Sequence, residues 1–425
     1  MRDTPPSGVS VLSFEISVTG ARLQPQDTTA AVSLLTNPVE VEVKQLETET
    51  AFLNTSSVPA GIIFSSITVT FANPLLTILN NSGQMFVVRG QTCLNGQICA
   101  LQPLLDLSSV TFTGTPFPLT LNINSPVGLV LDFDLNGSIQ SNLSITPTLS
   151  FTQLPAVQQT GELEEIENLT GTLTALGANQ FTVKDARSGL SFSIAVNSST
   201  QFEFAGCTAN NFSCIAMGQV LAVSLSVLGD GSLVAKRVVL EGDANEQEVE
   251  GTVTSVNAPG SQFHMVVVGE EPDVPNVNVG DLVTVNIQGG ANFQIDQEGL
   301  NISSGLSFAN ANDLVVGQNV LVRANSAIPG PIGTTITTSR LRLRMSQFTA
   351  TVASVTAPNF VVTGLPSLFT LNGVNQVQVQ TSLATGFEAV TGVTALKMTA
   401  MVSLRGLLFG TSGGPVLVAK KVRKR

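Results

Sequence analysis

The chain has 425 residues and a formal net charge of −11, with 43% apolar and only 12% charged residues. This much apolar material can fill several hydrophobic cores, which excludes an intrinsically disordered chain, and the length predicts two to four domains. Trp and Tyr are absent and there is one histidine. Side chains that usually stack on ligands or shuttle protons are therefore scarce.

Residues 1–155 read as a series of short strands. Apolar and polar side chains alternate over residues 9–18, 39–43, 66–71, 110–112, 119–123 and 128–135, with Gly, Pro, Asn and Ser between these runs. Such alternation is typical of β-strands with one buried face. No stretch reaches the ~18 consecutive apolar residues that a membrane-spanning helix needs. We therefore expect a β-sandwich at residues 1–155.

The four cysteines form two close pairs, Cys93 with Cys99 and Cys207 with Cys214. Each pair flanks turn-forming residues, so we expect two local disulfides, each contributing about 2 to 3 kcal/mol. Zinc is the alternative, but the spacings differ from a zinc knuckle and no histidine lies nearby. Disulfides predict an extracytoplasmic location. Residues 1–6 lack the apolar segment of an export signal, so we expect a signal peptide or lipid-anchor segment upstream of Met1.

The segment Asp132-Phe133-Asp134-Leu135-Asn136-Gly137 carries oxygen ligands in the order of a calcium loop. A calcium loop also needs a glutamate where this chain has Leu143. The alternative is a strand that ends in an Asn-Gly hairpin turn. We favour the hairpin, and at this stage cation binding by Asp132, Asp134 and Asn136 stays open.

A six-residue segment occurs three times, at residues 171–176, 251–256 and 350–355. Each copy precedes a strand headed by Phe and, later, a closing strand with cations. Between them lies a Gly-Gln strand, at Gly218 and Gly317, which is degenerate in the third copy. Repetition at this spacing predicts three small β-barrels of oligonucleotide-fold type, at 161–244, 245–345 and 346–425. Residues 153–160 are the expected linker.

Two resemblances follow from these residues. The repeats resemble the bacterial domain of unknown function 5666, and residues 229–240 match its closing G-x-L-x-A-x-x-V-x-L pattern closely. The first domain resembles the domain of unknown function 4382, through Arg2-Asp3-Thr4-Pro5-Pro6 and through Val58-Pro59-Ala60-Gly61 with the strand after it. Together they imply a secreted or lipid-anchored bacterial surface protein with no assigned chemistry.

Two acidic runs, 162–167 and 246–250, contain paired carboxylates. A glycosidase needs two carboxyls facing each other across a cleft. Alternation in a strand instead places Glu246, Glu248 and Glu250 on one face, so we expect a solvated edge. Serine-hydrolase and P-loop motifs are absent, and His264 is expected to be an outward polar side chain. We therefore expect no enzyme, no catalytic residue, no metal and no cofactor.

Charge separates the last unit from the others. Residues 346–425 hold seven Lys or Arg against Glu388 alone, while the first two barrels are acidic. Acidic barrels without Trp or Tyr do not favour nucleic-acid binding, and Phe202 and Phe204 are expected to pack. The basic end, residues 420–425, predicts either contact with an acidic envelope component or neighbouring chain, or a solvated tail.

These features favour a non-enzymatic, extracytoplasmic structural or interaction protein of a bacterial cell envelope. The alternative is a module that binds polysaccharide or another envelope ligand.

Overall fold

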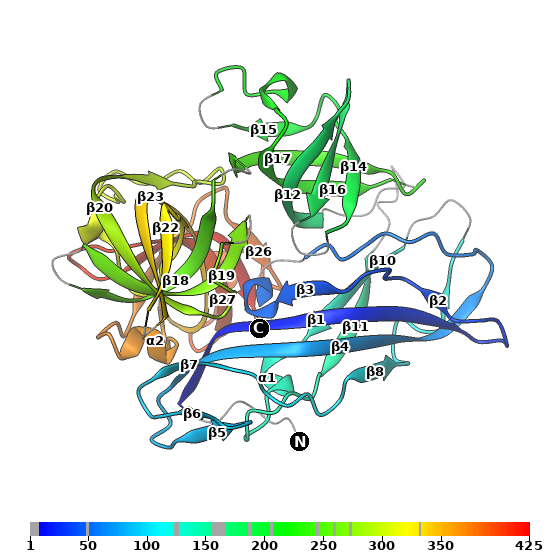
Figure 1. Ribbon diagram of the computed structural model, residues 1–425, viewed down its shortest axis with the longest axis horizontal. Helices are drawn as coiled ribbons and strands as arrows, with labels where there is room; N and C mark the ends of the chain where they lie inside the picture. The colour runs from blue at the N-terminus through cyan, green and yellow to red at the C-terminus, as the bar shows by residue number, and fades with distance from the viewer. Residues whose placement is uncertain are drawn as a thin grey trace.

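The computed structural model describes residues 8–47, 51–122, 127–154, 166–185, 189–204, 207–228, 230–243, 246–257, 261–271, 274–330 and 333–425. These residues form an all-β protein, as the sequence predicted, with an N-terminal part followed by three repeated units (Figure 1). Most of the expected linker, residues 155–160, lies outside the described residues, as do the acidic residues 162–165 and the segment 2–6.

Two long antiparallel strands, β1 and β4, organise the N-terminal part, and they pair from Val9↔Asn80 to Pro25↔Phe64. Shorter strands flank them in a seven-stranded sheet. Its members are β1 (Val9–Pro25), β2 (Val32–Ser33), β3 (Val39–Glu42), β4 (Ile63–Asn80), β7 (Ile98–Leu101), β8 (Ser109–Phe112) and β9 (Leu119–Thr120).

A second layer covers the inner face of this sheet. It contains β10 (Gly128–Phe133), paired with β11 (Leu149–Leu154), and one helical turn, α1 (Leu135–Ser138). Aromatic side chains join the layers, since the Phe133 ring lies 5.7 Å from Phe14 and 5.8 Å from Phe71. The remaining elements are η1 (Val43–Glu47) and a separate hairpin of β5 (Phe86–Val88) and β6 (Gln91–Cys93).

The three repeated units share one strand topology. Each unit has one short extra strand, at residues 201–203, 326–330 or 386–388, and five ring strands. Among the ring strands, the first pairs with the second and fourth, the second with the third, and the fifth with the third and fourth, so the pairings form a closed ring. The third and fifth strands are parallel and the other pairs antiparallel. A five-stranded ring of this kind is the small barrel that the repeated segments predicted.

The first barrel contains β12 (Ile166–Leu176), β13 (Gln180–Asp185), β14 (Ser191–Ala195), β15 (Gln201–Glu203), η2 (Phe212–Cys214), β16 (Gln219–Val227) and β17 (Leu233–Asp243). The second contains β18 (Glu248–Asn257), β19 (Gln262–Glu271), β20 (Leu282–Ile295), η3 (Ala311–Asp313), β21 (Asn319–Arg323), β22 (Ser326–Gly330) and the start of β23 (Gly333–Thr356). The third contains the end of β23, β24 (Asn359–Thr363), α2 (Ser367–Thr370), β25 (Val377–Gln380), β26 (Gly386–Glu388), η4 (Val393–Ala395), β27 (Met401–Phe409) and β28 (Val416–Lys424).

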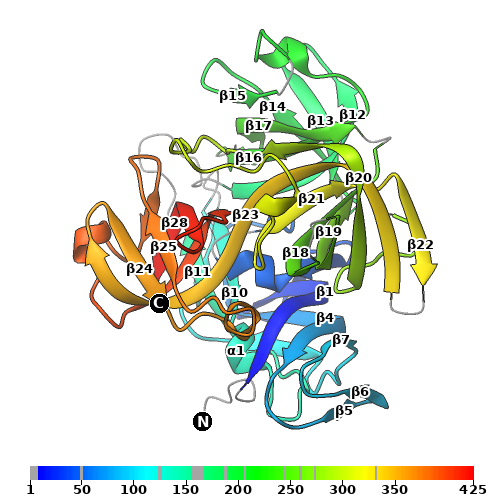
Figure 2. The same cartoon turned by 90° about the vertical axis from the view of Figure 1, so that its left-hand side faces the viewer.

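Strand β23 belongs to both the second and the third barrels. Its first half pairs with β20 and β21, and its second half pairs with β24 and β27. The boundary expected between residues 345 and 346 therefore falls inside a continuous strand, which Figure 2 shows crossing from one barrel to the next. The two barrels cannot move apart without breaking this strand.

One turn recurs before the fourth strand of every barrel. Gly218, Gly317 and Thr399 occupy the same place, with φ values of 82°, 86° and 68°. Each donates its N–H to the first strand of its own barrel, at the carbonyl of Leu173, Val253 or Val352 respectively. The third unit thus keeps the turn and a full strand β27 without the glycine, although its sequence predicted only a degenerate strand.

Apolar contacts pack the four parts against one another. Phe52 of the N-terminal part enters the core of the first barrel, 5.1 Å from Phe192. A further cluster joins the N-terminal part, the second barrel and the third, and it consists of Leu12, Leu79, Val266, Val316 and Leu368. The fold is therefore one packed body.

Candidate functional site

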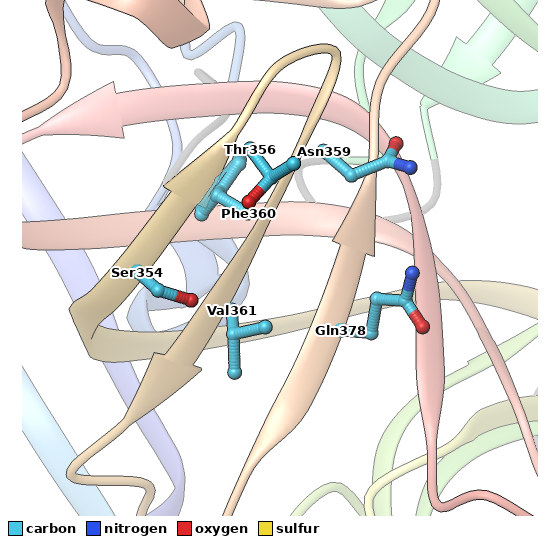
Figure 3. Close-up of a pocket in the computed structure, with 6 residues that line it drawn as sticks. All are labelled: Ser354, Thr356, Asn359, Phe360, Val361 and Gln378. Carbon is cyan, nitrogen blue, oxygen red and sulfur yellow. The ribbon is translucent and has the colours of Figure 1, made fainter.

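A hollow of about 210 Å³ lies on the outside of the third barrel. It is lined by Ser354 and Thr356 of β23, Asn359, Phe360 and Val361 of β24, and Gln378 of β25 (Figure 3). Its polar groups are hydroxyls and amides, which can hydrogen-bond to a neutral ligand but cannot act as general acids or bases at neutral pH. Phe360 is 1% exposed, so its ring offers no open face for stacking.

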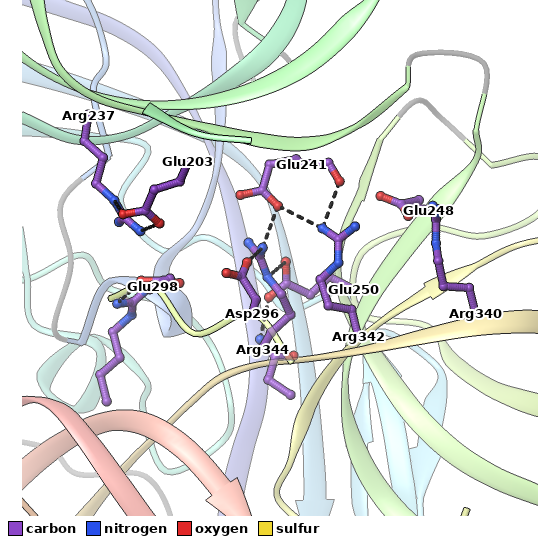
Figure 4. A network of polar contacts seen from close by, with 12 residues as sticks. Glu203, Arg237, Glu241, Glu248, Glu250, Asp296, Glu298, Arg340, Arg342 and Arg344 are labelled. Carbon is purple, nitrogen blue, oxygen red and sulfur yellow. Dashed lines mark hydrogen bonds and ion pairs between the residues drawn. The ribbon is translucent and has the colours of Figure 1, made fainter. Parts of the chain in front are cut away.

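A larger polar feature lies between the first and second barrels. Arg340, Arg342 and Arg344 alternate along β23, so their side chains share one face. Carboxylates from the ends of β17, β18 and β20 meet them there (Figure 4). We call this set the inter-barrel ion network; its other members are Glu241, Glu246, Glu248, Glu250, Asp296 and Arg323.

Arg344 is the centre of the inter-barrel ion network. Its Nη1 lies 2.5 Å from Glu241 Oε2 and 2.5 Å from Asp296 Oδ2, and its Nε lies 3.8 Å from Glu250 Oε2. Only 16% of its side chain is exposed. Burial opposes the charge of Arg344, but the facing carboxylates together outweigh it and hold its pKa well above the usual value.

Glu241 connects the first barrel to this centre. Its side chain accepts from Arg344, and its backbone carbonyl accepts from Arg342 Nη1 at 2.8 Å. Burial raises the pKa of Glu241 to about 7, while Arg344 acts in the opposite direction. Two barrels that are adjacent in sequence are thus held together through residues that are 101 and 103 positions apart.

A second ion pair joins the second and third barrels. Arg405 of β27 binds Glu298 through two hydrogen bonds of 2.9 and 3.0 Å, and Lys420 donates to the Glu298 carbonyl at 2.7 Å. Burial opposes the charge of Glu298, but Arg405, Arg344 and Arg237 together outweigh it and lower the pKa of this carboxyl. Side-chain exposure is 13% for Arg405 and 12% for Glu298, so this pair is largely removed from water.

The expectation of a solvated edge at Glu246, Glu248 and Glu250 is wrong. The three residues share a face, as alternation predicted, but that face meets Arg323, Arg340 and Arg344, and Glu248 is 6% exposed. The other acidic run, 162–167, lies outside the residues whose side chains the structure describes.

Most of the basic C-terminal residues are likewise engaged, so residues 420–425 do not form a solvated tail. They belong to β28 and its end, where Lys421 and Arg423 bind Glu388 at 2.6 and 2.9 Å. Arg425 donates to Ser403 Oγ at 2.7 Å, and Arg423 donates to the Glu47 carbonyl of the N-terminal part at 3.3 Å. The positive charge of the third barrel therefore stabilises contacts within the chain.

The candidate calcium loop adopts another structure. Asp134 caps α1, its Oδ1 accepting from Gly137 N at 3.0 Å, so Asn136-Gly137 lies in a helical turn where a hairpin was expected. Asp132 is exposed on β10. Within the described ranges, no group of three or more His, Cys, Asp or Glu is placed to hold a metal ion.

The four cysteines form two disulfides, and the histidine lies on a strand of the second barrel. Cys93 bonds to Cys99 and Cys207 to Cys214, with Cα separations of 5.8 and 6.0 Å, which confirms both predicted pairings. His264 is half-buried on β19, and its Nδ1 lies 2.8 Å from Ser255 Oγ. A hydroxyl partner does not position a histidine as a carboxylate would in a catalytic triad.

Sequence reasoning missed one pair of carboxyls, Glu15 and Glu42, which are cross-strand neighbours on β1 and β3. Burial, followed by repulsion from Glu40 and Glu42, raises the pKa of Glu15 to about 7. Burial raises the pKa of Glu42 to about 7, against hydrogen bonds from Phe14 N and Gln45 N. Glu270 of the second barrel also repels Glu15. The pKa of Glu15 therefore depends on the contact between the N-terminal part and the second barrel.

These carboxyls predict a stability that depends on pH. Folded pKa values near 7 exceed the unfolded value of 4.5, so the stabilisation is fully present below pH 4.5 and is lost as the pH rises through 7. We expect Glu15→Gln to be more stable than wild type at pH 8 and its free energy of unfolding to vary less between pH 5 and 8. Urea unfolding at each pH measures this; matching profiles for Glu15→Gln, wild type and the exposed control Asp132→Asn would contradict it.

The comparisons with known proteins bear on the first barrel. A family model described as Domain of unknown function (DUF5666) matches residues 170–239. This range runs from β12 into β17, so the resemblance predicted for the first repeat is confirmed. A search of the curated proteins finds no match. Among the described residues, no helix is both long and apolar enough to cross a membrane.

Proposed function

We propose that this protein is a non-enzymatic, extracytoplasmic structural or interaction protein of a bacterial cell envelope. The observation that supports the proposal is that its largely buried ion pairs join one barrel to the next. Arg344, Glu241 and Asp296 hold the first barrel to the second, and Arg405 with Glu298 holds the second to the third. Charges placed between units favour a rigid multi-barrel body that presents its outer surface to partners.

The compartment is part of the same proposal. Both cysteine pairs are bonded, and disulfides persist in oxidising environments such as the periplasm and cell surface. The resemblance of the N-terminal part to the domain of unknown function 4382 would add a secreted or lipid-anchored location. Contact with an envelope component through the basic third barrel is a weaker part of the proposal, because Lys421 and Arg423 already pair with Glu388.

Deleting the gene in the bacterium that encodes the protein tests the proposal. We expect the protein in the envelope fraction with both disulfides formed by non-reducing peptide mapping, and we expect the deletion strain to be more sensitive to detergent. Wild type and Arg323→Met should restore resistance, whereas Arg344→Met should not, because it loosens the body. Recovery from the cytosol with four free thiols would contradict the location, and full rescue by Arg344→Met would contradict the structural role.

A polysaccharide-binding module is the second candidate, and the hollow on the third barrel favours it. The hollow lies over the first three strands of that barrel, close to the strand face with which oligonucleotide-fold barrels bind oligosaccharides. Uncharged hydroxyls and amides suit a neutral sugar. In the same experiment, a Gln378→Ala strain that fails to restore resistance while its protein stays folded would favour this second function.

A further inference from the structure

A two-stranded hairpin, β5–β6, stands apart from the other sheets of the N-terminal part. Its register pairs Phe86 with Cys93 and Val88 with Gln91. Arg89 and Gly90 form the two-residue turn, with φ values of 48° and 85°, as in the turns that favour tight hairpins. Both views place the hairpin at the lower edge of the molecule (Figures 1 and 2).

One face of this hairpin is buried and the other carries large apolar side chains in the open. Val88 is 6% exposed and Cys93 is fully buried, whereas Met85 and Val87 are 57% and 59% exposed. Leu94, which follows β6, is 47% exposed. Large apolar side chains that are exposed together on one rigid element indicate a contact surface. We call Met85, Val87 and Leu94 the hairpin apolar face.

The hairpin is held rigidly in this position. Asn80, which is fully buried, donates its Nδ2 to the carbonyls of Gln84 and Cys93 at 2.8 and 3.1 Å. The disulfide from Cys93 to Cys99 joins β6 to β7, and Gln91 Oε1 accepts from Gln102 N at 2.7 Å. These bonds fix both strands, so the apolar face is presented to solvent and cannot fold inward. A contact surface ordered in advance loses little entropy on binding.

The charges around the hairpin indicate the kind of surface that it contacts. The exposed Arg89 is the one Lys or Arg between residues 45 and 183, and residues 50–105 contain no Asp or Glu. The whole chain carries −11, so this region lacks the acidic character of the rest. A cation among apolar side chains complements a surface that is anionic outside and apolar beneath.

We propose that the hairpin apolar face docks onto the surface of an anionic lipid membrane. Met85, Val87 and Leu94 enter the headgroup region, and Arg89 meets lipid phosphate. A stable protein interface buries ~800 Å² per partner over about 20 to 30 residues, and the hairpin apolar face consists of three side chains, which disfavours a second copy. The inference deepens the proposed envelope location and rests on it for its biological setting.

Vesicle binding tests the proposal, and it does so independently of where the cell places the protein. The probes are vesicles of phosphatidylglycerol with phosphatidylethanolamine, and vesicles of phosphatidylcholine alone. We expect flotation with the anionic vesicles only. Replacing Met85, Val87 and Leu94 with Ser should weaken binding at least about tenfold, and Arg89→Gln should weaken it about fivefold at low salt. The matched control replaces Met217, Ile328 and Met398, which are 58%, 62% and 66% exposed, with Ser and should bind as wild type.

A second measurement does not depend on how the triple variant folds. The chain contains no Trp, so Val87→Trp supplies a single fluorescent reporter, and its emission should shift to the blue when anionic vesicles are added. Ile328→Trp should show no shift. No flotation of wild type, equal loss in the matched control, or an unshifted Val87→Trp overturns the proposal. Concentration-dependent dimers that the triple variant abolishes would make this face an interface between copies and overturn the lipid assignment.

Discussion

Replacing Arg344 with Met is expected to lower the free energy of unfolding by about 3 to 5 kcal/mol. Arg344 faces Glu241 and Asp296 at 2.5 Å and Glu250 at 3.8 Å, with 16% of its side chain exposed. Without the guanidinium, Glu241, Glu250 and Asp296 stay largely buried beside one another, and Glu241 keeps the more distant Arg342, whose Nη1 lies 3.6 Å from its Oε2. Such an arrangement is far more costly than the loss of a surface pair.

The control comes from the same network. Arg323 pairs with Glu246 at 2.9 Å but is 39% exposed, so Arg323→Met should cost about 1 kcal/mol or less. Adding Glu241→Gln to Arg344→Met removes one of the buried carboxylates that lose Arg344 and should restore about 1 kcal/mol or more. Urea unfolding measures all three variants. Equal, small losses for Arg344→Met and Arg323→Met would show that water screens the network and that it does not hold the barrels together.

Local sequence patterns predicted the strands, but not which neighbouring parts of the chain pack against each strand face. Alternation correctly placed Glu246, Glu248 and Glu250 on one face, and it predicted a closing strand at residues 336–343, which lies within β23. Whether that face meets water depends on where the neighbouring barrel lies, and Glu241 is 103 residues from its partner Arg344. No period of two or three residues carries information about contacts at that separation.

The C-terminal residues show the same limit. A run of cations at the end of a chain is typical of a solvated tail, yet Val422 is fully buried and Lys421 and Arg423 pair with Glu388. The closing strand itself was predicted, at residues 417–422, and it corresponds to β28 (Val416–Lys424); the partners of its cations were not predictable from the local pattern. The cysteine pairs were predictable because their partners are six and seven residues apart, and close spacing restricts the geometry.

The candidate calcium loop failed for a different reason. An Asn-Gly pair after an alternating run favours a hairpin turn, but Asp134 accepts the Gly137 N–H and so caps a helical turn. An Asp three residues before a Gly is compatible with a hairpin and with the start of a helical turn. The signal for the helical turn was the preference of Asp for the N-cap position. The hollow on the third barrel had no sequence signal, because Ser354, Asn359 and Gln378 are ordinary outward residues of three separate strands.

The recurring turn before the fourth strand predicts the second large effect. Gly317 has a φ of 86°, and a Cβ added there would lie 2.2 Å from Cζ of Phe369. Phe369 belongs to α2 of the third barrel and is 3% exposed, so it has little room to move. Gly317→Ala therefore combines left-handed backbone strain with overpacking, and we expect a loss of roughly 2 to 4 kcal/mol.

The other turns provide the comparison that separates these two causes. Gly218 has nearly the same φ, 82°, but a Cβ there would meet nothing within 4 Å, so Gly218→Ala should cost only the backbone strain, about 1 kcal/mol. Thr399, which is exposed, shows that a side chain can occupy this turn. The difference between the two Ala variants in urea unfolding measures the contact with Phe369, and Phe369→Leu should reduce it. If Gly317→Ala and Gly218→Ala lose the same free energy, α2 does not press on this turn, and the second and third barrels are held together by strand β23 and the Arg405–Glu298 ion pair without that contact.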